Sequence, residues 1–228
     1  MITNLKNILQ LATLLILQYA CQSTANEPKL TSSIEQHSFV NKDTSHVHKL
    51  SKNNAEVQAF IEIPAGTIDK WELNKTTGQL EWERIDNQPR KINYIGYPGN
   101  YGMIPKTLLP KEAGGDGDPL DILVLGPPAQ RGTLAICTII GVLRLLDHNE
   151  QDDKLIAIAA DAPFSAIKTM DELDKIHAGV SQIIQLWFEN YKGPGKIKSR
   201  GFGDRNEALK LLEKAQIAYQ LNQQTTKQ

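Results

Sequence analysis

The sequence predicts an α+β fold in which a small barrel-like sheet comes first along the chain and helices follow. Short apolar segments such as 57–63 and 121–126 are bounded by Gly, Pro and Asn, which is typical of the strands of a small barrel. Farther along, 179–191 and 204–219 carry apolar residues at the three- and four-residue spacing of amphipathic helices. With 228 residues, 40% hydrophobic and 22% charged, the chain is expected to form one domain with extensions.

Residues 1–25 have the pattern of an export signal. The apolar run 8–17 follows Lys6 and is shorter than the roughly 20 residues that span a bilayer. "STA" before Asn26 is a candidate cleavage site, whereas "LQYAC" would make Cys21 the lipid-bearing residue of a bacterial lipoprotein. The prediction is therefore an exported protein, periplasmic or anchored to a membrane. The alternative is a cytoplasmic protein that begins with a helix.

Residues 26–55 are expected to be a flexible arm, because Ser, Thr, Asn, Lys and Gln dominate the segment and apolar positions are few. His46 and His48 alternate there, but no third metal ligand is near in sequence, which favours a solvated loop. The chain has two cysteines, so a disulfide framework is not indicated. Cys137 lies within "LAICTIIGVL" and is expected in the core.

The predicted domain, 56–220, begins with strands and ends with helices. The expected strands are 57–63, 70–73, 79–85, 121–126, 134–147 and 154–160. The second and third should form a hairpin around "NKTTG", where Gly78 supplies a positive φ. The first helix should end at "KGPG", and Asp204 with Glu207 forms a capping box for the second.

The stretch 113–126, "AGGDGDPLDILVLG", places three carboxylates at the start of an apolar strand. A polar turn explains Asp116 and Asp118 but leaves Asp121 as a lone charge at the mouth of a buried strand, which is costly. A calcium-binding EF loop starting at Asp116 would need Gly at its sixth position and Glu at its twelfth, where the chain has Asp121 and Pro127. A magnesium site fits better, because hard cations take carboxylate oxygens and offset their mutual repulsion.

A second acidic segment, "LLDHNEQDDKL", contributes Asp147, Glu150, Asp152 and Asp153 between two predicted strands. If both acidic segments face one cavity of the barrel, they imply more than one metal. Paired metals activate water and clamp the oxygens of phosphoryl transfer.

Cations and hydroxyls near these carboxylates suit a phosphate ligand. Lys70 and Glu72 share one face of their strand. The remaining candidates are Arg84, Arg90, Tyr97, Tyr101, Lys154, Tyr191 and Lys192. Taken singly, each of these is more often a surface residue, so only the set is informative. The net charge of −1 gives no general attraction for nucleic acid.

With "GGDGDPLDILVLG", the chain resembles the family I soluble inorganic pyrophosphatases, whose signature is D-x-D-P-x-D. The likeness continues through "IEIPAG", "KWE", "YPGNYG", "DHNEQDDK" and "NYKGPG", and covers roughly 56–215. It implies a small, distorted five-stranded OB-like β-barrel with two main α-helices packed outside. The implied reaction is hydrolysis of inorganic diphosphate to two phosphates by metal-activated water, with several magnesium ions per site and manganese or zinc as substitutes. A homo-oligomer, a hexamer by analogy, is implied as well.

The resemblance also implies a role for each matching residue. Asp118 is expected to orient and deprotonate the attacking water. The expected metal ligands are Glu62, Asp116, Asp118, Asp121, Asp147 and Asp152. The expected phosphate-binding residues are Lys70, Arg84 or Arg90, Tyr101, Lys154, Tyr191 and Lys192, of which Lys70, Tyr101 and Lys192 assist catalysis with Asp118. The expected supporting residues are Glu72, Tyr97 and Glu150.

The chain departs from the family pattern in three places. Asn149 replaces the usual Gly before Glu150, although Asn also tolerates positive φ. Arg84 has the expected spacing from Gly78, whereas Arg90 fits the spacing to Tyr97 better and is favoured. The export signal is unusual in a typically cytoplasmic family. Two other functions stay open: a non-catalytic OB-type binding protein, and a broader exported phosphatase or nuclease.

Overall fold

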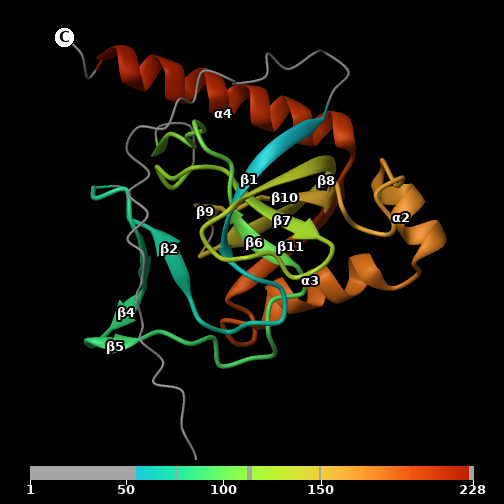
Figure 1. Cartoon of the computed structure of the whole chain (residues 1–228), viewed down its shortest axis with the longest axis horizontal. Coiled ribbons are helices and arrows are strands. Elements are labelled where there is room, and N and C mark those ends of the chain that lie inside the picture. Colours follow the sequence, from blue (N-terminus) through green and yellow to red (C-terminus); the bar gives the residue numbers. More distant parts are fainter. Residues whose placement is uncertain (1–54, 75, 112–114, 149, 226–228) are drawn as a thin grey trace, which may run out of the picture. The chain divides into compact units, whose positions relative to one another are not determined.

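The computed structural model describes residues 55–74, 76–111, 115–148 and 150–225. Within these ranges the chain forms a mixed main sheet, two small hairpins and three α-helices, which confirms the predicted α+β fold (Figure 1). The predictions for the export signal, for nearly all of the flexible arm with His46 and His48, and for Asn149 lie outside the described residues.

The main sheet follows the order β1-β6-β7-β10-β8-β11, and β9 pairs with β8. Its strands are β1 (Glu56–Ile63), β6 (Asn100–Met103), β7 (Asp121–Leu125), β8 (Leu134–Asp147), β9 (Glu150–Gln151), β10 (Lys154–Ala159) and β11 (Ile197–Gly203). β7 and β10 run parallel, and the other pairs are antiparallel. β8 also pairs with β1, so the sheet curls back toward its first strand.

The long strand β8 pairs with several other strands of this curled sheet along its length. Its first half pairs with β1 and its second half with β11, and β10 pairs along its middle. Gly141 of β8 lies close to the Met170 side chain and to the backbone of Gly203. A Cβ there would lie 2.4 Å from Met170 Cγ and 2.8 Å from the Gly203 carbonyl oxygen, so only glycine fits without displacement.

Three helices follow β10 and cover the sheet (Figure 1). They are α2 (Met170–Ile176), α3 (Val180–Asn190) and α4 (Arg205–Thr225). The buried face of α3 carries Trp187 and Phe188, and α4 buries small residues and Leu212 as it packs on β8. Large apolar side chains of β7 and β10 are fully buried between these layers, as expected for a parallel pair covered on both faces.

The structure contains elements that were not predicted. Strands β6 and β11 have little alternation of apolar and polar residues, and the short helix α2 depends on an N-cap hydrogen bond from Glu172 N to Thr169 Oγ1. The expected two main helices are therefore α3 and α4, with α2 as a third. The cap at the start of α4 is confirmed, because Asp204 Oδ1 accepts from Glu207 N at 2.8 Å.

Two hairpins project beside the main sheet (Figure 1). β2 (Trp71–Leu73) pairs with β3 (Leu80–Trp82), and Gly78 has φ 67°, so the predicted turn is confirmed. The predicted strand 79–85 is instead interrupted, because β4 (Arg84–Ile85) turns back onto β5 (Gln88–Pro89). Asp86 and Asn87 both have positive φ, which suits the tight turn of a two-residue hairpin.

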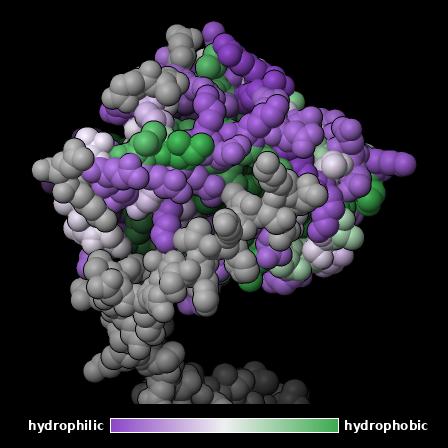
Figure 2. Space-filling view, turned by 90° about the horizontal axis from the view of Figure 1, so that it is seen from above, coloured by the Kyte–Doolittle hydropathy of each residue, from purple (hydrophilic) through white to green (hydrophobic). Residues whose placement is uncertain are grey.

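Cys137 is fully buried, as predicted. None of the helices in the described ranges has the length and apolar character needed to cross a membrane. In the face shown in Figure 2, most of the described surface is hydrophilic and hydrophobic side chains gather only in small groups.

Candidate active site

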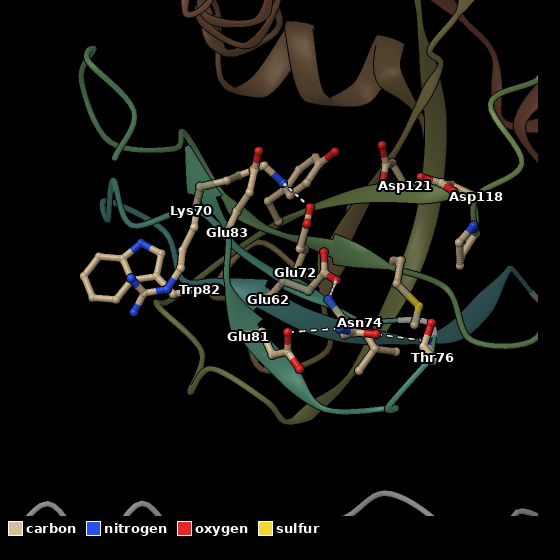
Figure 3. A pocket seen from close by; sticks show the side chains of 15 residues that line it. Glu62, Lys70, Glu72, Asn74, Thr76, Glu81, Trp82, Glu83, Asp118 and Asp121 are labelled. Atoms are coloured by element: carbon tan, nitrogen blue, oxygen red, sulfur yellow. Dashed lines mark hydrogen bonds and ion pairs between the residues drawn. The ribbon is translucent and has the colours of Figure 1, made fainter. Parts of the chain in front are cut away.

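A cavity of about 640 Å³ opens beside the β2–β3 hairpin and the start of β7. Figure 3 shows Lys70, Glu72 and Glu62 on the side of the hairpin, with Asp118 and Asp121 beyond them. The predicted site residues that line this cavity are Glu62, Lys70, Glu72, Arg84, Tyr101, Asp118 and Asp121. Residues from four separate motifs of the sequence thus meet around one hollow.

Glu62 is a buried carboxyl group near the end of β1. Its Oε1 accepts a hydrogen bond from Leu73 N at 2.7 Å, which ties β1 to the hairpin. Burial raises the pKa of Glu62 from 4.5 to about 7, although this hydrogen bond and the charge of Lys70 act in the opposite direction. A carboxylate held this far from water is stabilised in its charged form by a nearby cation.

Lys70 and Glu72 lie on the same side of the hairpin, as predicted, with Lys70 Nζ 3.8 Å from Glu72 Oε2. Lys70 Nζ is also 5.8 Å from the centre of the Tyr101 ring, within the range of a cation–π contact. The Lys70 ammonium group therefore lies between the Glu72 carboxylate on the hairpin and the Tyr101 ring, which lines the cavity.

Lys154 joins the two acidic segments. Its side chain is 3% exposed, and its Nζ donates to Asp121 Oδ2 at 2.5 Å and to Asp152 Oδ1. Burial alone would lower the pKa of Lys154, but the two carboxylates outweigh it and raise that pKa. Burial also raises the pKa of Asp152, against the pull of Lys154. The predicted meeting of both acidic segments at one place is therefore present in the structure.

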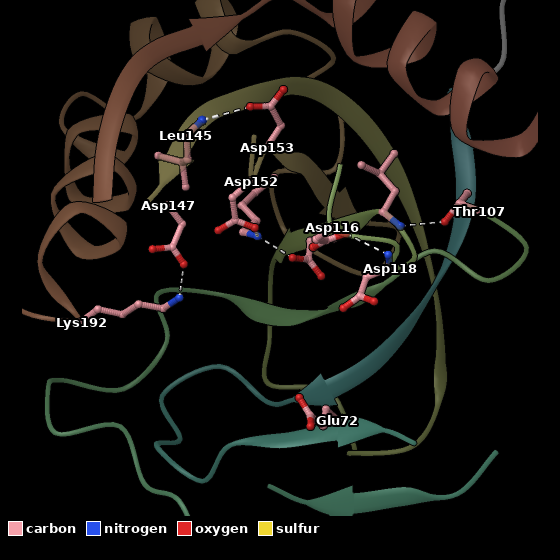
Figure 4. A network of polar contacts seen from close by, with 12 residues as sticks. Glu72, Thr107, Asp116, Asp118, Leu145, Asp147, Asp152, Asp153 and Lys192 are labelled. Atoms are coloured by element: carbon pink, nitrogen blue, oxygen red, sulfur yellow. Dashed lines mark hydrogen bonds and ion pairs between the residues drawn. The ribbon is translucent and has the colours of Figure 1, made fainter. Parts of the chain in front are cut away.

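Asp147 is paired with Lys192 beyond the end of α3 (Figure 4). Burial raises the pKa of Asp147, but the hydrogen bond and charge of Lys192 outweigh it and leave the pKa below its ordinary value. Asp147 Oδ1 is buried and lies 2.7 Å from His148 Nδ1. Both oxygens of Asp147 therefore have a nitrogen close by, one from Lys192 and one from His148.

Asp116 and Asp118 lie on a tight loop beside these groups (Figure 4). Asp118 N donates to Asp116 Oδ1 at 2.8 Å, and Gly117 between them has φ 84°. The loop is also held by hydrogen bonds from Leu109 N to Asp118 O and from Gly117 N to Leu109 O, both 2.8 Å. The predicted turn thus fixes the backbone of Asp118 at the edge of the cavity.

The predicted tyrosines form an aromatic cluster with α3. The ring centres of Tyr97 and Tyr101 are 5.1 Å apart, and Tyr191 stacks on Trp187 at 4.6 Å. Burial raises the pKa of Tyr97, Tyr101 and Tyr191, so their hydroxyl groups remain neutral near pH 7. A neutral phenol can donate a hydrogen bond to an anion.

The two candidate arginines occupy different places. Arg84 is exposed on β4 and borders the first cavity, while its Nη1 donates to the Asn87 carbonyl oxygen at 2.8 Å. Arg90 borders a second cavity of about 270 Å³ together with Tyr191 and Lys192. Glu150 lies exposed on β9, opposite Asp147.

Carboxylate oxygens, the donors that a hard metal ion requires, surround the cavity. Within the described ranges, no three His, Cys, Asp or Glu side chains converge closely enough to form a ligand group. Lys154 and Lys192 instead neutralise Asp121, Asp152 and Asp147. The donors around the cavity nevertheless include the carboxylate oxygens of Glu62, Asp118 and Asp121. This chemistry fits a hard divalent cation.

Sequence reasoning missed several residues that organise the site. Glu83 lies on the cavity wall and pairs with Arg90. Asn100, within the quoted "YPGNYG", is 1% exposed and accepts from Ala65 N and Ala129 N. Trp71 stacks on Trp82 at 5.4 Å, which stiffens the hairpin that carries Glu72. Asn100 and Trp71 stand in the quoted motifs "YPGNYG" and "KWE", and the polar Asn100 amid Gly and Tyr was the available signal.

Comparisons with known proteins agree with this arrangement of residues. Residues 59–220 match the sequence profile of a family described as inorganic pyrophosphatase. The inorganic pyrophosphatase of Campylobacter jejuni is 38% identical over 167 residues, covering 70% of this chain and 90% of that protein. The one from Helicobacter pylori is 38% identical over 167 residues, covering 70% and 89%.

Solved structures give the same result. The inorganic pyrophosphatase structure from Helicobacter pylori has a TM-score of 0.63 and 35% identity, covering 75% of this chain and 96% of that one. The structure from Thermus thermophilus has a TM-score of 0.62 and 30% identity, covering 75% and 94%. The similarity in sequence and in fold spans the strands, hairpins and helices that surround the cavity.

Proposed function

The chain belongs to the inorganic pyrophosphatase family, whose members hydrolyse diphosphate, and we propose that the carboxylates and cations around Asp118 and Asp121 perform this reaction. The observation that carries the assignment of the site is the junction at Lys154. There the two acidic segments, 33 residues apart at Asp121 and Lys154, meet beside the cavity.

The family is metal-dependent, and we propose magnesium as the metal, with manganese or zinc as substitutes. Glu62, Asp116, Asp118, Asp121, Asp147 and Asp152 are the residues that would hold it. When bound, magnesium supplies a Lewis acid that makes water more acidic and offsets negative charge on the phosphate oxygens. The raised pKa of the buried Glu62 carboxyl, and the carboxylates of Asp118 and Asp121 on the same cavity, support this proposal.

In the proposed reaction, Asp118 orients a water molecule and accepts its proton while the water oxygen attacks one phosphorus. The bond from that phosphorus to the bridging oxygen breaks, and the second phosphate leaves with the electron pair. Lys70, Lys192 and an arginine bind the anionic oxygens, and Tyr101 donates a hydrogen bond from its neutral hydroxyl group. This chemistry is mainly positioning and charge compensation, as in other phosphoryl transfers.

We propose that the pairings β1–β6–β7–β10–β8 and β8–β1 make a small five-stranded barrel of the OB type. This shape accounts for the meeting of strand ends from distant parts of the sequence at one cavity. Glu72, Tyr97 and Glu150 are proposed to support the site from the hairpin, the aromatic cluster and β9.

We further propose export through residues 1–25, with lipid attachment at Cys21 as one form of the mature protein, and a homo-oligomer as the assembly. These proposals rest on the sequence pattern and on analogy with the family. Mass spectrometry of the mature N-terminus tests the first. An acylated Cys21 or a start near Asn26 is expected, and an intact Met1 in the mature protein would contradict export.

The function is tested by phosphate release from diphosphate with magnesium, with EDTA as the control. Release that depends on magnesium is expected. Binding of diphosphate without release would favour a non-catalytic binding protein. Cleavage of nucleotides as fast as diphosphate would favour a broader phosphatase, because the compact cationic set is expected to select a small, highly charged anion.

A further inference from the structure

Glu83 holds the guanidinium group of Arg90. Arg90 Nη1 lies 2.8 Å from Glu83 Oε1 and 2.9 Å from Oε2, and the two side chains are 26% and 22% exposed. Partial burial works against the charged form of Arg90, but the hydrogen bond and charge of Glu83 raise its pKa. Both contacts use Nη1, and a guanidinium has five N–H donors, so Arg90 retains donors that Glu83 does not engage.

The backbone fixes the same pair to Lys70. Lys70 N donates to Arg90 O at 3.1 Å, Arg90 N to Glu83 O at 2.8 Å, and Glu83 N to Lys70 O at 2.9 Å. These three hydrogen bonds form a ring that joins Lys70, Glu83 and Arg90. Trp82 Nε1 also donates to Arg90 O at 2.8 Å. The positions of two proposed phosphate-binding cations are therefore set by one rigid unit.

Arg84 is arranged differently. Its Nη1 donates to the Asn87 carbonyl oxygen within its own hairpin, and the residue is exposed. Asp86 and Asn87 form the turn that brings the chain back and pairs Arg84 with Pro89, beside Arg90, but the two arginines border different cavities. Arg84 stabilises this hairpin, whereas Arg90 faces the cavity that Tyr191 and Lys192 line.

We propose that Arg90 is the phosphate-binding arginine and that Glu83 is a positioning residue that aims its guanidinium group at the anion. This proposal rests on the proposed function, because it assumes that diphosphate binds beside Lys70 and Lys192. Glu83 acts through Arg90 and does not touch the substrate. Its negative charge alone would repel diphosphate, so positioning and simple repulsion predict opposite effects when Glu83 is removed.

The test compares the KM for diphosphate of Glu83→Ala and Glu83→Gln with the wild type. Glu83→Ala is expected to raise KM about tenfold with a smaller change in kcat, the order of effect of one charge-assisted hydrogen bond. The KM of Glu83→Gln is expected to lie between those of the wild type and Glu83→Ala, because the amide oxygen of Gln can still accept a hydrogen bond from Arg90 Nη1. The control is Glu213→Ala, because Glu213 is an exposed carboxylate on α4 that lines neither cavity, and KM should not change.

A double-mutant cycle with Arg90→Ala separates positioning from a general structural effect. In the Arg90→Ala background, Glu83→Ala is expected to leave KM unchanged. An unchanged or lower KM in the single variant, or an equal rise in both backgrounds, would overturn the proposal. The dissociation constant of inorganic phosphate, measured by calorimetry, should rise from the wild type to Glu83→Gln and again to Glu83→Ala, as KM does. Failure of the wild type to release phosphate would count against the proposed function. The phosphate dissociation constants test the role of Glu83 independently of that outcome.

Discussion

Replacing Glu62 with Gln should change how the stability of the metal-free protein depends on pH. Glu62 is 6% exposed, and its pKa rises from 4.5 to about 7 because burial disfavours the charged carboxylate. At about 1.4 kcal/mol per pH unit, this interval corresponds to about 3 kcal/mol of folding free energy. The Gln side chain keeps an oxygen that can accept from Leu73 N, so the substitution removes mainly the ionisation.

The sign of this pH dependence of stability follows from the protons bound by the folded and unfolded states. Between pH 4.5 and about 7 the folded state holds a proton on Glu62 that the unfolded state has released, so stability falls as pH rises. The contribution is fully present below 4.5 and is lost above about 7. Glu62→Gln should therefore become more stable relative to the wild type by about 3 kcal/mol from pH 4.5 to pH 8.

Urea unfolding in EDTA at several pH values measures this difference. Glu81→Gln is the matched control for a Glu-to-Gln change, because Glu81 is exposed on the β2–β3 hairpin whereas Glu62 is buried on β1. Magnesium should remove the pH dependence from the wild type by favouring the charged carboxylate. A difference between Glu62→Gln and wild type that is independent of pH in EDTA would refute the reasoning.

Three further predictions concern other parts of the molecule. Lys154→Met should destabilise the metal-free protein by about 3–5 kcal/mol in urea unfolding, since Asp121 and Asp152 lose a buried partner; a loss below about 1 kcal/mol would contradict this. Asp204→Ala should lower stability by about 1 kcal/mol in thermal unfolding while turnover stays normal, because only the cap of α4 is lost; unchanged thermal stability would show that the cap contributes nothing. Calcium in place of magnesium should abolish phosphate release, because calcium prefers more ligands at longer distances; full activity with calcium would count against the proposed site.

The parts of the fold with strong local signals were predictable from the sequence. The β2–β3 hairpin follows from alternation on either side of Gly78, and the start of α4 follows from Asp204. By contrast, β11 carries Lys, Ser, Arg and two glycines, and its strand structure comes from pairing with the second half of β8. Tertiary pairing of this kind leaves no periodic pattern in the strand itself.

The candidate site was predictable in its residues more than in its contacts. Asp121 stood out because a charge at the mouth of a buried strand requires a partner, and the resemblance to the pyrophosphatase family implied which residues would accompany it. The sequence did not indicate that Lys154 would bridge Asp121 and Asp152, because those contacts depend on the parallel pairing of β7 and β10. Similarly, the pairing of Glu83 with Arg90 depends on the unpredicted β4–β5 hairpin.

The central claim is that the acidic cluster at Asp118 and Asp121 is the reaction centre for diphosphate hydrolysis. Steady-state phosphate release by Asp118→Asn with magnesium tests this claim most directly, with thermal unfolding to verify that the variant is folded. The proposed proton acceptor predicts a kcat at least about 100-fold below the wild type with an unchanged melting temperature. Undiminished turnover in a folded Asp118→Asn protein would contradict the assignment.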